Sequence, residues 1–437
     1  MMVEVDRLEI KPALRVGGVM SVPGDKSISH RAIILSALAD GEATITNYCP
    51  GEDCLHTAAA CQAMGVPIEI ALDRLRVAGK GLWGLREPDS IVDCGNSGTG
   101  IRLLAGVLAG QDFFSVLTGD ASIRRRPMGR VVGPLREMGA VIAGRRGGEL
   151  APLAIAGARL RGIAYSSPIA SAQVKSSVLL AGLFAEGTTS VTEPALSRDH
   201  TERLFDHLGI PVSRNGLTVS LAGQRAFAAK DIAVAGDLSA AAFFLVAASL
   251  VPESDVTITG VGVNPTRTGI LEVLQEMGAH IELLNLRVQA GEPVADLSVR
   301  SAPLRGVTIG SERIPKTIDE FPILCVAAAC AQGETIISGA EELRVKESDR
   351  IAAMATELRR LGAAVEERPD GLRIVGGRPL QGAVCQSHGD HRVAMSMMVA
   401  GLVARGETRV EDIACVATSF PGFDKKLSGL LTPSGQG

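Results

Sequence analysis

Residues 23–32 gather basic and hydroxyl-bearing side chains in the stretch PGDKSISHRA. The Pro-Gly pair predicts a turn, and Asp25 and Ser27 are both good N-cap residues for the apolar helix that we expect at 32–39. A helix N-terminus carries unpaired N–H groups and a positive dipole end, so Lys26 beside it adds to a site for a ligand with several negative charges. A capped helix with solvated basic residues explains the stretch equally well. A nucleotide-binding P-loop does not fit, because that motif needs Gly directly before Lys.

Further motifs place polar groups at predicted helix starts or in turns. They are DCGNSGTGIR at 93–102, TGDASIRRRPM at 118–128, SAQVKS at 171–176 with SRDH at 197–200, TIDEFP at 317–322, RVKESDR at 344–350 and DHR at 390–392. Each motif alone is explained by a glycine turn, a helix cap, a solvated loop or an exposed ion-pair face. Together the motifs contribute several positively charged side chains. Placing these side chains close together costs free energy unless a polyanion lies among them. These cations are Lys26, Arg31, Arg126, Arg198, Lys346, Arg350 and Arg392.

Two of these motifs make specific local predictions. Arg126 precedes Pro127, so it should be the most constrained of three consecutive arginines and should present a fixed guanidinium fork to a carboxylate or phosphate. Lys346 and Arg350 are four residues apart, so they should project together from a helix, with Glu347 between them around the turn.

A helix end, a glycine turn and a strand recur six times along the chain. The copies lie at 35–45, 104–116, 179–191, 246–258, 326–336 and 399–410. Five further helix ends close on a glycine, at positions 65, 139, 209, 278 and 362. These glycines are 69 to 84 residues apart, which is too long for a solenoid repeat and suits a module of two helices and several strands. The sequence therefore predicts an α/β protein built from six related modules.

Modules of this length must bury one face against their neighbours, so we expect two domains of three modules each. We expect the chain to cross from one domain to the other at two points, the Pro23-Gly24 turn and the Gly236-Asp237 pair. Each of them follows a strand-like run. One discontinuous domain should then comprise 1–22 and 237–437, with its first strand contributed by the N-terminus. The inserted domain should comprise 23–236.

The composition excludes several classes of protein. The net charge is −4, the pI is near 6 and only 3% of residues are aromatic, so we expect no nucleic-acid partner. Eight scattered cysteines without CxxC pairs favour reduced thiols over a zinc site or a disulfide framework. We find no signal-peptide pattern and no apolar stretch that could cross a bilayer. These observations predict a cytoplasmic protein with no membrane partner.

The motifs in combination resemble those of the 5-enolpyruvylshikimate-3-phosphate synthases (3-phosphoshikimate 1-carboxyvinyltransferases), members of the enolpyruvyl transferase family. The resemblance runs from Val19 to about Phe423 and rests on PGDKSISHR, GNSGT, RRPM, SAQ, IDEFP, RVKESDR and DHR. It implies a two-domain clamp in which each domain holds three βαβαββ repeats. It also implies transfer of the enolpyruvyl (carboxyvinyl) group of phosphoenolpyruvate to the 5-hydroxyl of shikimate 3-phosphate. Phosphate leaves through a tetrahedral intermediate, on the shikimate pathway to chorismate and aromatic amino acids, and no metal or organic cofactor is implied.

The resemblance also implies roles for individual residues. Shikimate 3-phosphate should contact Lys26, Ser27, Arg31, Ser171, Ala172, Gln173, Arg198, Asp319 and Lys346. Phosphoenolpyruvate should contact Lys26, Asn96, Gly98, Arg126, Gln173, Arg350 and Arg392. Lys26, Asp319 and Glu347 are the expected catalytic residues, with Asp319 as the base for the 5-hydroxyl and Glu347 as the acid for the methylene carbon. Burial should raise the pKa of Glu347 so that it keeps a proton near pH 7, while cations should keep Asp319 ionised.

Two positions depart from the pattern of many family members. Glu342 stands where an asparagine is common, and Thr418 stands where a lysine precedes the final S-F-P. The resemblance further implies inhibition by glyphosate at the phosphoenolpyruvate site, which Gly98→Ala should weaken by crowding. We expect a monomer.

Two other functions stay open. UDP-N-acetylglucosamine enolpyruvyl transferase has the same fold and donor, although the cysteine typical of that family is absent from 115–126. The second alternative is a non-catalytic protein that binds phosphorylated metabolites.

Overall fold

The computed structural model describes residues 6–431, which form two compact α/β units. Unit 1 contains the chain up to Pro23, Gly236–Arg287 and the chain from Pro293 onward. Unit 2 contains Gly24–Ala235 and the short segment Val288–Glu292. The crossings that we expected after residues 22 and 236 are found after Pro23 and Ala235. The segment Val288–Glu292 does not belong with the discontinuous domain, where the sequence placed it.

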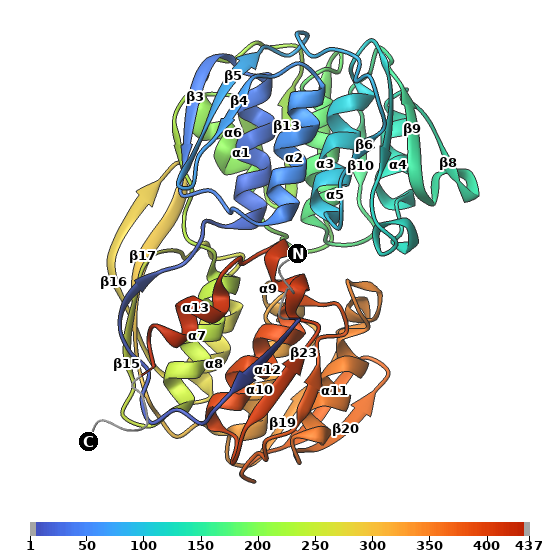
Figure 1. Ribbon diagram of the computed structural model, residues 1–437. Coiled ribbons are helices and arrows are strands. Elements are labelled where there is room, and N and C mark those ends of the chain that lie inside the picture. The colour runs from blue at the N-terminus through green and yellow to red at the C-terminus, as the bar shows by residue number, and fades with distance from the viewer. Residues whose placement is uncertain (1–5, 432–437) are drawn as a thin grey trace. The chain divides into compact units, whose positions relative to one another are not determined.

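Two modules of unit 2 follow the predicted βαβαββ order (Figure 1). One consists of β6 (Val92–Asp93), α3 (Gly98–Ala109), β7 (Phe114–Thr118), α4 (Gly129–Glu137), β8 (Val141–Arg145) and β9 (Leu150–Ala156), with the short 3-10 helices η1 (Ile123–Arg125) and η2 (Arg146–Gly148) between them. The other consists of β10 (Ala164–Ser166), α5 (Ala172–Gly182), β11 (Thr188–Thr192), α6 (His200–Leu208), β12 (Val212–Asn215) and β13 (Thr218–Ala222). In each sheet the first strand is parallel to the second, and the fourth lies antiparallel between the second and the third.

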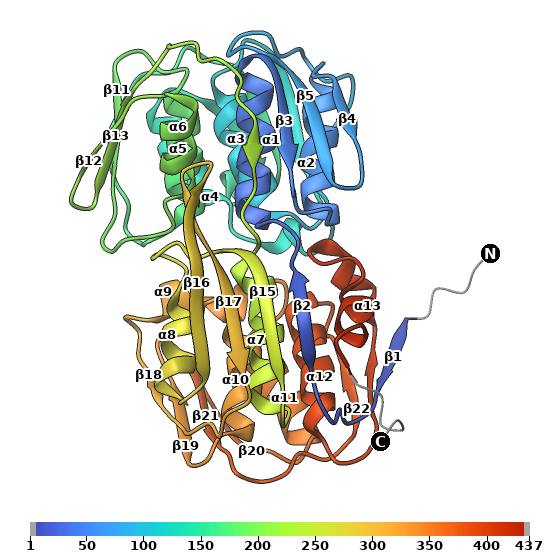
Figure 2. The same cartoon turned by 90° about the vertical axis from the view of Figure 1, so that its left-hand side faces the viewer.

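The first modules of the two units exchange their opening strands. In unit 2, α1 (Lys26–Leu38), β3 (Asp40–Thr46), α2 (Glu52–Ala63), β4 (Ile68–Ile70) and β5 (Arg74–Lys80) are completed by β14 (Ile232–Ala233), which is parallel to β3. In unit 1, α7 (Leu238–Leu250), β15 (Asp255–Gly262), α8 (Gly269–Glu276), β16 (His280–Gln289) and β17 (Glu292–Arg300) are completed by β2 (Gly17–Ser21), which is parallel to β15. The sheet order β16-β17-β15-β2 can be followed in Figure 2.

The remaining modules of unit 1 lie in the C-terminal half of the chain. One consists of β18 (Thr308–Ile309), α9 (Ile314–Thr317), α10 (Phe321–Cys330), β19 (Glu334–Ile337), η3 (Glu341–Val345), α11 (Arg350–Arg360), β20 (Ala364–Arg368) and β21 (Gly371–Val375). The last consists of β22 (Val384–Gln386), α12 (His391–Val403), β23 (Thr408–Glu411), η4 (Ile413–Thr418) and α13 (Phe423–Ser428). Its three-stranded sheet is closed by the N-terminal strand β1 (Arg7–Ile10), which pairs antiparallel with β23.

The tip of the β16–β17 hairpin explains why Val288–Glu292 groups with unit 2. Glu292 Oε1 lies 2.7 Å from His200 Nδ1, and both side chains are buried. Arg203 donates to the carbonyl of Gly291 at 3.2 Å. These partners are about ninety residues earlier in the chain, so no local pattern at the hairpin could have predicted the assignment.

The repeat pattern read from the sequence is confirmed. All six predicted copies are a helix followed by a strand: α1 and β3, α3 and β7, α5 and β11, α7 and β15, α10 and β19, and α12 and β23. The five glycines at 65, 139, 209, 278 and 362 have φ between 78° and 104°. Glycine adopts this left-handed conformation without steric cost, so it ends each helix and turns the chain into the next strand.

Six helices are buried along most of their length: α1, α3 and α5 in unit 2, and α7, α10 and α12 in unit 1. Helix α7, for example, reads LSAAAFFLVAASL. A helix that is apolar on every side is stable only where other elements cover it. The polar exceptions in unit 2 include His30, Arg31, Arg102 and Lys175, all within the first two turns of their helices. Buried polar groups of this kind need partners, and those partners define the site.

Candidate active site

The predicted site residues of unit 2 lie at or beside the starts of its buried helices. Helix α1 begins at Lys26, α3 at Gly98 and α5 at Ala172, and a side-chain oxygen of the preceding residue caps each of them. Of the two caps that the sequence offered for α1, Asp25 is the one used, and the helix begins six residues before the expected position 32. Each start presents free N–H groups and a positive dipole end, which together favour an anion.

Lys26 and Ser27 form the first turn of α1. Lys26 Nζ lies 2.9 Å from Asp53 Oδ2 on α2, and both side chains are largely buried. Ser27 is half-buried, and its carbonyl accepts a hydrogen bond from Arg31 at 2.8 Å. The two predicted substrate-binding residues therefore have fixed positions on one helical turn.

Arg31 is buried and held by several neutral oxygens. Its Nε donates to Thr201 Oγ1 at 2.7 Å and its Nη2 donates to Ser176 Oγ at 2.6 Å. Burial lowers the pKa of Arg31 to about 10, against the opposing effect of Glu202. The guanidinium is thus still charged at neutral pH. The hydroxyl groups that accept these hydrogen bonds are neutral, so the positive charge of Arg31 is available to a nearby anion.

The glycine loop before α3 lies beside Arg126. The amide of Asn96 donates to Asp120 Oδ2 at 2.6 Å, which fixes one side of the loop. A Cβ atom on Gly98 would lie 2.9 Å from Cζ of Arg126, so this guanidinium packs directly against the loop backbone. Arg124 and Arg125 are exposed whereas Arg126 is only 9% exposed, so it is the constrained member of the three, as predicted from Pro127.

Arg102 is a residue of the candidate site that the sequence reasoning missed. Its Nη1 donates to Gln173 Oε1 at 2.6 Å and to the Gly98 carbonyl at 3.2 Å, and its Nη2 donates to the Pro127 carbonyl at 2.9 Å. The amide of Gln173 in turn donates to Thr99 Oγ1 at 2.9 Å. One buried guanidinium therefore joins the GNSGT, RRPM and SAQ motifs. The one signal in the sequence was that Arg102 lies in an otherwise apolar helix, four residues after Gly98.

The remaining predicted residues of unit 2 lie around the starts of α5 and α6. The N–H of Ser171 donates to Glu193 Oε1 at 3.2 Å. Glu193 also forms a buried ion pair with Lys175 at 2.8 Å, and Lys175 pairs with Glu202 of α6 at 2.8 Å. Arg198 is half-buried in the loop before α6, and its charge contributes to lowering the pKa of Arg31.

In unit 1, Asp319 lies between two arginines. Arg392 Nη1 donates to the Asp319 backbone carbonyl at 2.9 Å, and its Nη2 is 3.9 Å from the carboxylate. Arg350 Nη1 is 3.6 Å from Asp319 Oδ1. Asp319 therefore has beside it the cations that the sequence analysis expected.

Arg350 is buried and contacts several carboxylates. Its Nε donates to Asp390 Oδ2 at 2.8 Å and its Nη2 donates to Glu347 Oε2 at 2.7 Å. Burial alone would lower the pKa of Arg350, but Asp390, Glu347 and Asp319 raise it well above its ordinary value. Burial would likewise raise the pKa of Asp390, and the Arg350 charge instead lowers it. Glu347 is 15% exposed and paired with an arginine, whereas we expected burial to raise its pKa.

Lys346 does not share a helix face with Arg350, contrary to the sequence prediction. The 3-10 helix η3 ends at Val345 and α11 begins at Arg350, so Lys346 and Glu347 lie in the intervening loop. Asp349 caps α11 by accepting from Ala352 N at 3.0 Å, which sets the start of the helix later than the i,i+4 interpretation required. Lys346 Nζ instead lies 3.3 Å from Glu342.

The chain matches the family model described as EPSP synthase (3-phosphoshikimate 1-carboxyvinyltransferase) over residues 10–427. It belongs to the EPSP synthase family. The 3-phosphoshikimate 1-carboxyvinyltransferase of Geotalea uraniireducens is 55% identical over 424 residues, which are 97% of this chain and 99% of the relative. That of Geobacter sulfurreducens is 56% identical over 420 residues, 96% of this chain and 98% of the relative. A solved EPSP synthase structure from Acinetobacter baumannii matches with a TM-score of 0.88 at 45% identity, covering 97% of this chain and 98% of that one.

Membership of this family confirms the resemblance and the fold expected from the motifs. The two positions that depart from the family pattern have local partners here. Glu342 is the residue that pairs with Lys346, and Thr418 Oγ1 lies 3.3 Å from His391 Nδ1. His391 directly precedes Arg392, so Thr418 contacts the DHR motif although it carries no charge.

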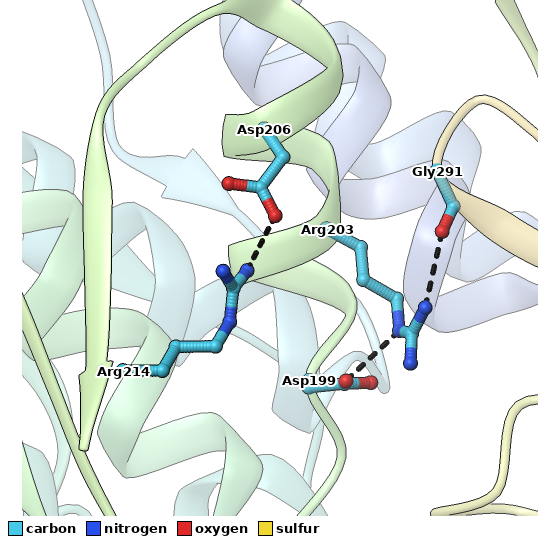
Figure 3. Close-up of a pocket in the computed structure, with 5 residues that line it drawn as sticks. All are labelled: Asp199, Arg203, Asp206, Arg214 and Gly291. Carbon is cyan, nitrogen blue, oxygen red and sulfur yellow. Dashed lines mark hydrogen bonds and ion pairs between the residues drawn. The ribbon is translucent and has the colours of Figure 1, made fainter.

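A small polar pocket in unit 2 holds none of the predicted site residues (Figure 3). It is lined by Asp199, Arg203, Asp206, Arg214 and Gly291. Arg203 pairs with Asp199 at 2.9 Å and Arg214 pairs with Asp206 at 2.6 Å, so each of its arginines is matched by a carboxylate of the same pocket. We therefore do not assign the reaction to it.

Within residues 6–431, no helix is long and apolar enough to cross a membrane. In the same part of the chain, no three His, Cys, Asp or Glu residues are grouped so that they could hold a metal ion.

Proposed function

We propose that this chain transfers the enolpyruvyl group of phosphoenolpyruvate to the 5-hydroxyl of shikimate 3-phosphate and releases phosphate. The observation that carries the proposal is that the Arg350 guanidinium lies 3.6 Å from Asp319 and 2.7 Å from Glu347. The reaction needs a base and an acid, and both carboxyls share one cation that can also bind an anionic substrate. A protein that only binds phosphorylated metabolites needs neither carboxyl.

On this proposal, unit 2 supplies most of the substrate contacts. Shikimate 3-phosphate is held by Lys26, Ser27, Arg31, Ser171, Ala172, Gln173 and Arg198, together with Asp319 and Lys346 of unit 1. Phosphoenolpyruvate is held by Lys26, Asn96, Gly98, Arg126 and Gln173, together with Arg350 and Arg392 of unit 1. Three capped helix starts and several buried arginines support this assignment, because both suit phosphate and carboxylate groups.

Asp319 is the proposed base. It accepts the proton of the 5-hydroxyl as that oxygen bonds to C2 of phosphoenolpyruvate. Glu347 is the proposed acid and gives its proton to the C3 methylene, which becomes a methyl group in the tetrahedral adduct. Glu347, now deprotonated, then takes a proton back from that methyl group as phosphate leaves C2 with the proton held by Asp319, and the enol ether product forms. Lys26 belongs to the catalytic set as the cation nearest the start of α1.

Glu347 has to gain a proton before it can act as the acid. An anionic group of phosphoenolpyruvate at Arg350 competes with Glu347 for the same guanidinium. Weakening this ion pair removes the main interaction that favours the charged carboxylate, so substrate binding and protonation of Glu347 are linked. We propose this exchange in place of the permanently buried, protonated Glu347 that we first expected.

Three further expectations are part of the proposal. Glyphosate should inhibit by occupying the phosphoenolpyruvate site, the chain should act as a monomer without a metal or organic cofactor, and it should be cytoplasmic. The cysteine usage supports the last of these, since eight scattered cysteines without CxxC pairs favour reduced thiols. Light scattering after gel filtration tests the monomer, and assay in excess chelator tests independence from metals.

The deciding experiment measures phosphate released from phosphoenolpyruvate with shikimate 3-phosphate or with UDP-N-acetylglucosamine as the acceptor. We expect release only with shikimate 3-phosphate. Release with the sugar nucleotide alone would support the sister enzyme, and release with neither acceptor would support a binding protein. Asp319→Ala and Glu347→Ala should keep shikimate 3-phosphate binding within about threefold and lower kcat by about 100-fold or more.

A further inference from the structure

His30 lies at the centre of a buried hydrogen-bond chain that the proposed mechanism does not use. It is in the second turn of α1, between Ser29 and Arg31, and its side chain has no exposed surface. Its Nδ1 is 2.7 Å from Thr57 Oγ1 on α2, and its Nε2 is 3.2 Å from Ser97 Oγ at the start of α3. One imidazole therefore joins three separate elements of unit 2.

The neighbouring hydrogen bonds assign a direction to this chain. Ser97 Oγ already accepts from Gly100 N at 2.9 Å as the cap of α3, so its own proton is directed to His30 Nε2. His30 then donates from Nδ1 to Thr57 Oγ1, and Thr57 donates to the Asp53 carbonyl at 3.4 Å. Every hydroxyl proton in this arrangement has an acceptor, and it requires a neutral imidazole protonated on Nδ1.

The two ends of the chain lie at groups proposed to bind phosphoenolpyruvate. Ser97 stands between Asn96 and Gly98 in the glycine loop. At the other end, Asp53 forms the ion pair with Lys26 at 2.9 Å. Thr57 donates to the backbone carbonyl of Asp53 and not to the carboxylate that pairs with Lys26, so a shift of the His30 ring would move the loop cap at Ser97.

The space around His30 leaves little room for an alternative arrangement. A Cβ on Gly100 would lie 3.0 Å from both Ser97 Oγ and Thr57 Oγ1. Ser97, Thr57 and His30 are each at most 1% exposed. Water has no access to replace a lost bond, so the positions of the three side chains depend on one another.

We infer that His30 is a positioning residue for the phosphoenolpyruvate site: through Ser97 it fixes the start of α3 relative to α1. This inference rests on the proposed function and adds a residue to it. Because His30 acts through Ser97, it takes no part in proton transfer to either substrate.

The electrostatic surroundings of His30 agree with a ring that stays neutral and uses its N–H only for hydrogen bonding. Burial, together with the charges of Lys26 and Arg31 and against the opposing charge of Asp25, lowers the pKa of His30 to about 3. The ring is therefore neutral at every pH at which the enzyme would be assayed. A role in acid-base catalysis would instead require a pKa near the working pH.

Two substitutions separate the two ends of the chain. In His30→Asn the amide occupies the place of Nδ1 and can still donate to Thr57, but it does not reach Ser97. In His30→Gln the amide oxygen occupies the place of Nε2 and can still accept from Ser97. His207→Gln is the matched control, because His207 also lies in unit 2, near the end of α6, and its ring contacts the Asp231 carbonyl at 3.0 Å.

We expect His30→Asn to raise the KM for phosphoenolpyruvate by about 5- to 20-fold, as for the loss of about one buried hydrogen bond. His30→Gln should raise it less than threefold, and neither variant should change the dissociation constant of shikimate 3-phosphate or the shape of the pH profile. His30→Asn combined with Ser97→Ala should cost little more than Ser97→Ala alone, because Ser97→Ala already breaks the bond to His30 as well as the cap of α3. Equal effects on both substrates, full additivity, or a shifted pH profile would each overturn the inference.

Failure of the proposed function and failure of this inference are distinguishable. If wild-type protein releases no phosphate, the proposed function is wrong, and calorimetric binding of phosphoenolpyruvate then provides the same comparison. If His30→Asn does not fold, Ser97→Ala tests the chain instead, since alanine removes the hydroxyl that contacts His30 Nε2. Unchanged affinity for phosphoenolpyruvate in Ser97→Ala would contradict the inference.

Discussion

Arg350 donates from Nη2 to Glu347 Oε2 at 2.7 Å, across only three residues of sequence. The same guanidinium donates from Nε to Asp390, whose side chain has no exposed surface. Asp390 therefore holds Arg350 from its buried side. Glu347 is 15% exposed and lies on the side that a substrate can reach. This asymmetry makes Glu347 the replaceable partner, and it leads directly to the first prediction.

Glu347→Gln should lower kcat by about 100-fold or more, because the amide cannot donate a proton to carbon. The KM for phosphoenolpyruvate should stay the same or fall, because the neutral amide no longer competes with the substrate for Arg350. Steady-state phosphate release checks both constants. Glu341→Gln, an exposed neutral substitution in η3, is the control and should leave both unchanged. A rise in KM with unchanged kcat would contradict the proposed role.

Arg102→Lys should raise the KM of both substrates and lower kcat/KM by about 10- to 100-fold. Lysine keeps the charge but cannot donate at once to Gly98, Pro127 and Gln173. The effect should fall on both substrates because Gln173 is proposed to contact both. Arg136→Lys is the matched control, since Arg136 also donates to a backbone carbonyl, that of Ile142, but on α4 away from these motifs. Similar losses in the two variants would show a general effect on stability.

The difference between Arg102 and Arg126 shows what sequence reasoning could and could not find. Arg126 was identified because its constraint is local: proline follows it, and it alone of three arginines is buried. Arg102 owes its role to Pro127 and Gln173, which are 25 and 71 residues away in the sequence. A single arginine within an apolar helix carries no sign of such distant partners until the helices are packed.

The fold was predictable for a related reason. The six helix–glycine–strand copies and the five left-handed glycines are local features repeated along the chain, so chance agreement could be discounted. The exchange of β2 and β14 between the first modules depends on strand pairing across 238 residues for Val19 with Thr257 and 187 residues for Ile45 with Ile232. The start of α11 was misplaced because spacing alone suggested a helix through Lys346, whereas the Asp349 cap sets its first turn at Arg350.

The buried His30 predicts a measurable proton uptake on unfolding. Its pKa is about 3 in the folded chain and about 6.5 when unfolded, so both states are neutral above pH 7 and the residue contributes nothing there. Between these two values only the unfolded state binds the proton, so the folded state loses stability as pH falls, by about 1.4 kcal/mol per pH unit. At pH 5, wild-type protein should take up about one more proton on unfolding in denaturant than His30→Gln does.

Calorimetry in weak buffer, or titration in a pH-stat, measures the number of protons taken up on unfolding. Neither method requires the unfolding to be reversible. The other titrating groups are common to both proteins and cancel in the difference. At pH 8 the two proteins should take up equal numbers of protons. A difference that is absent at pH 5 would mean that His30 is not held neutral in the folded chain.

Gly98→Ala should weaken glyphosate inhibition more than it weakens phosphoenolpyruvate binding. The added methyl carbon would lie 2.9 Å from both Cζ and Nη1 of Arg126, closer than real Cβ atoms approach, and Arg126 is only 9% exposed. The guanidinium must therefore move into the space that a ligand of this site would fill. Glyphosate is the longer of the two molecules, so it should lose more affinity. We expect the KM for phosphoenolpyruvate to rise about 10-fold and the inhibition constant about 100-fold, which are about 1.4 and 2.7 kcal/mol.

Gly133→Ala is the matched control for this change, because a Cβ at Gly133 in α4 would meet no atom within 4 Å. It should leave both constants unchanged. Adding Arg126→Lys to Gly98→Ala should then relieve part of the crowding, since the lysine side chain ends in one small ammonium group in place of the planar fork. Inhibition curves for the three variants and wild type decide the matter. Equal glyphosate sensitivity of Gly98→Ala and wild type would mean that the contact with Arg126 does not limit the room available to the inhibitor.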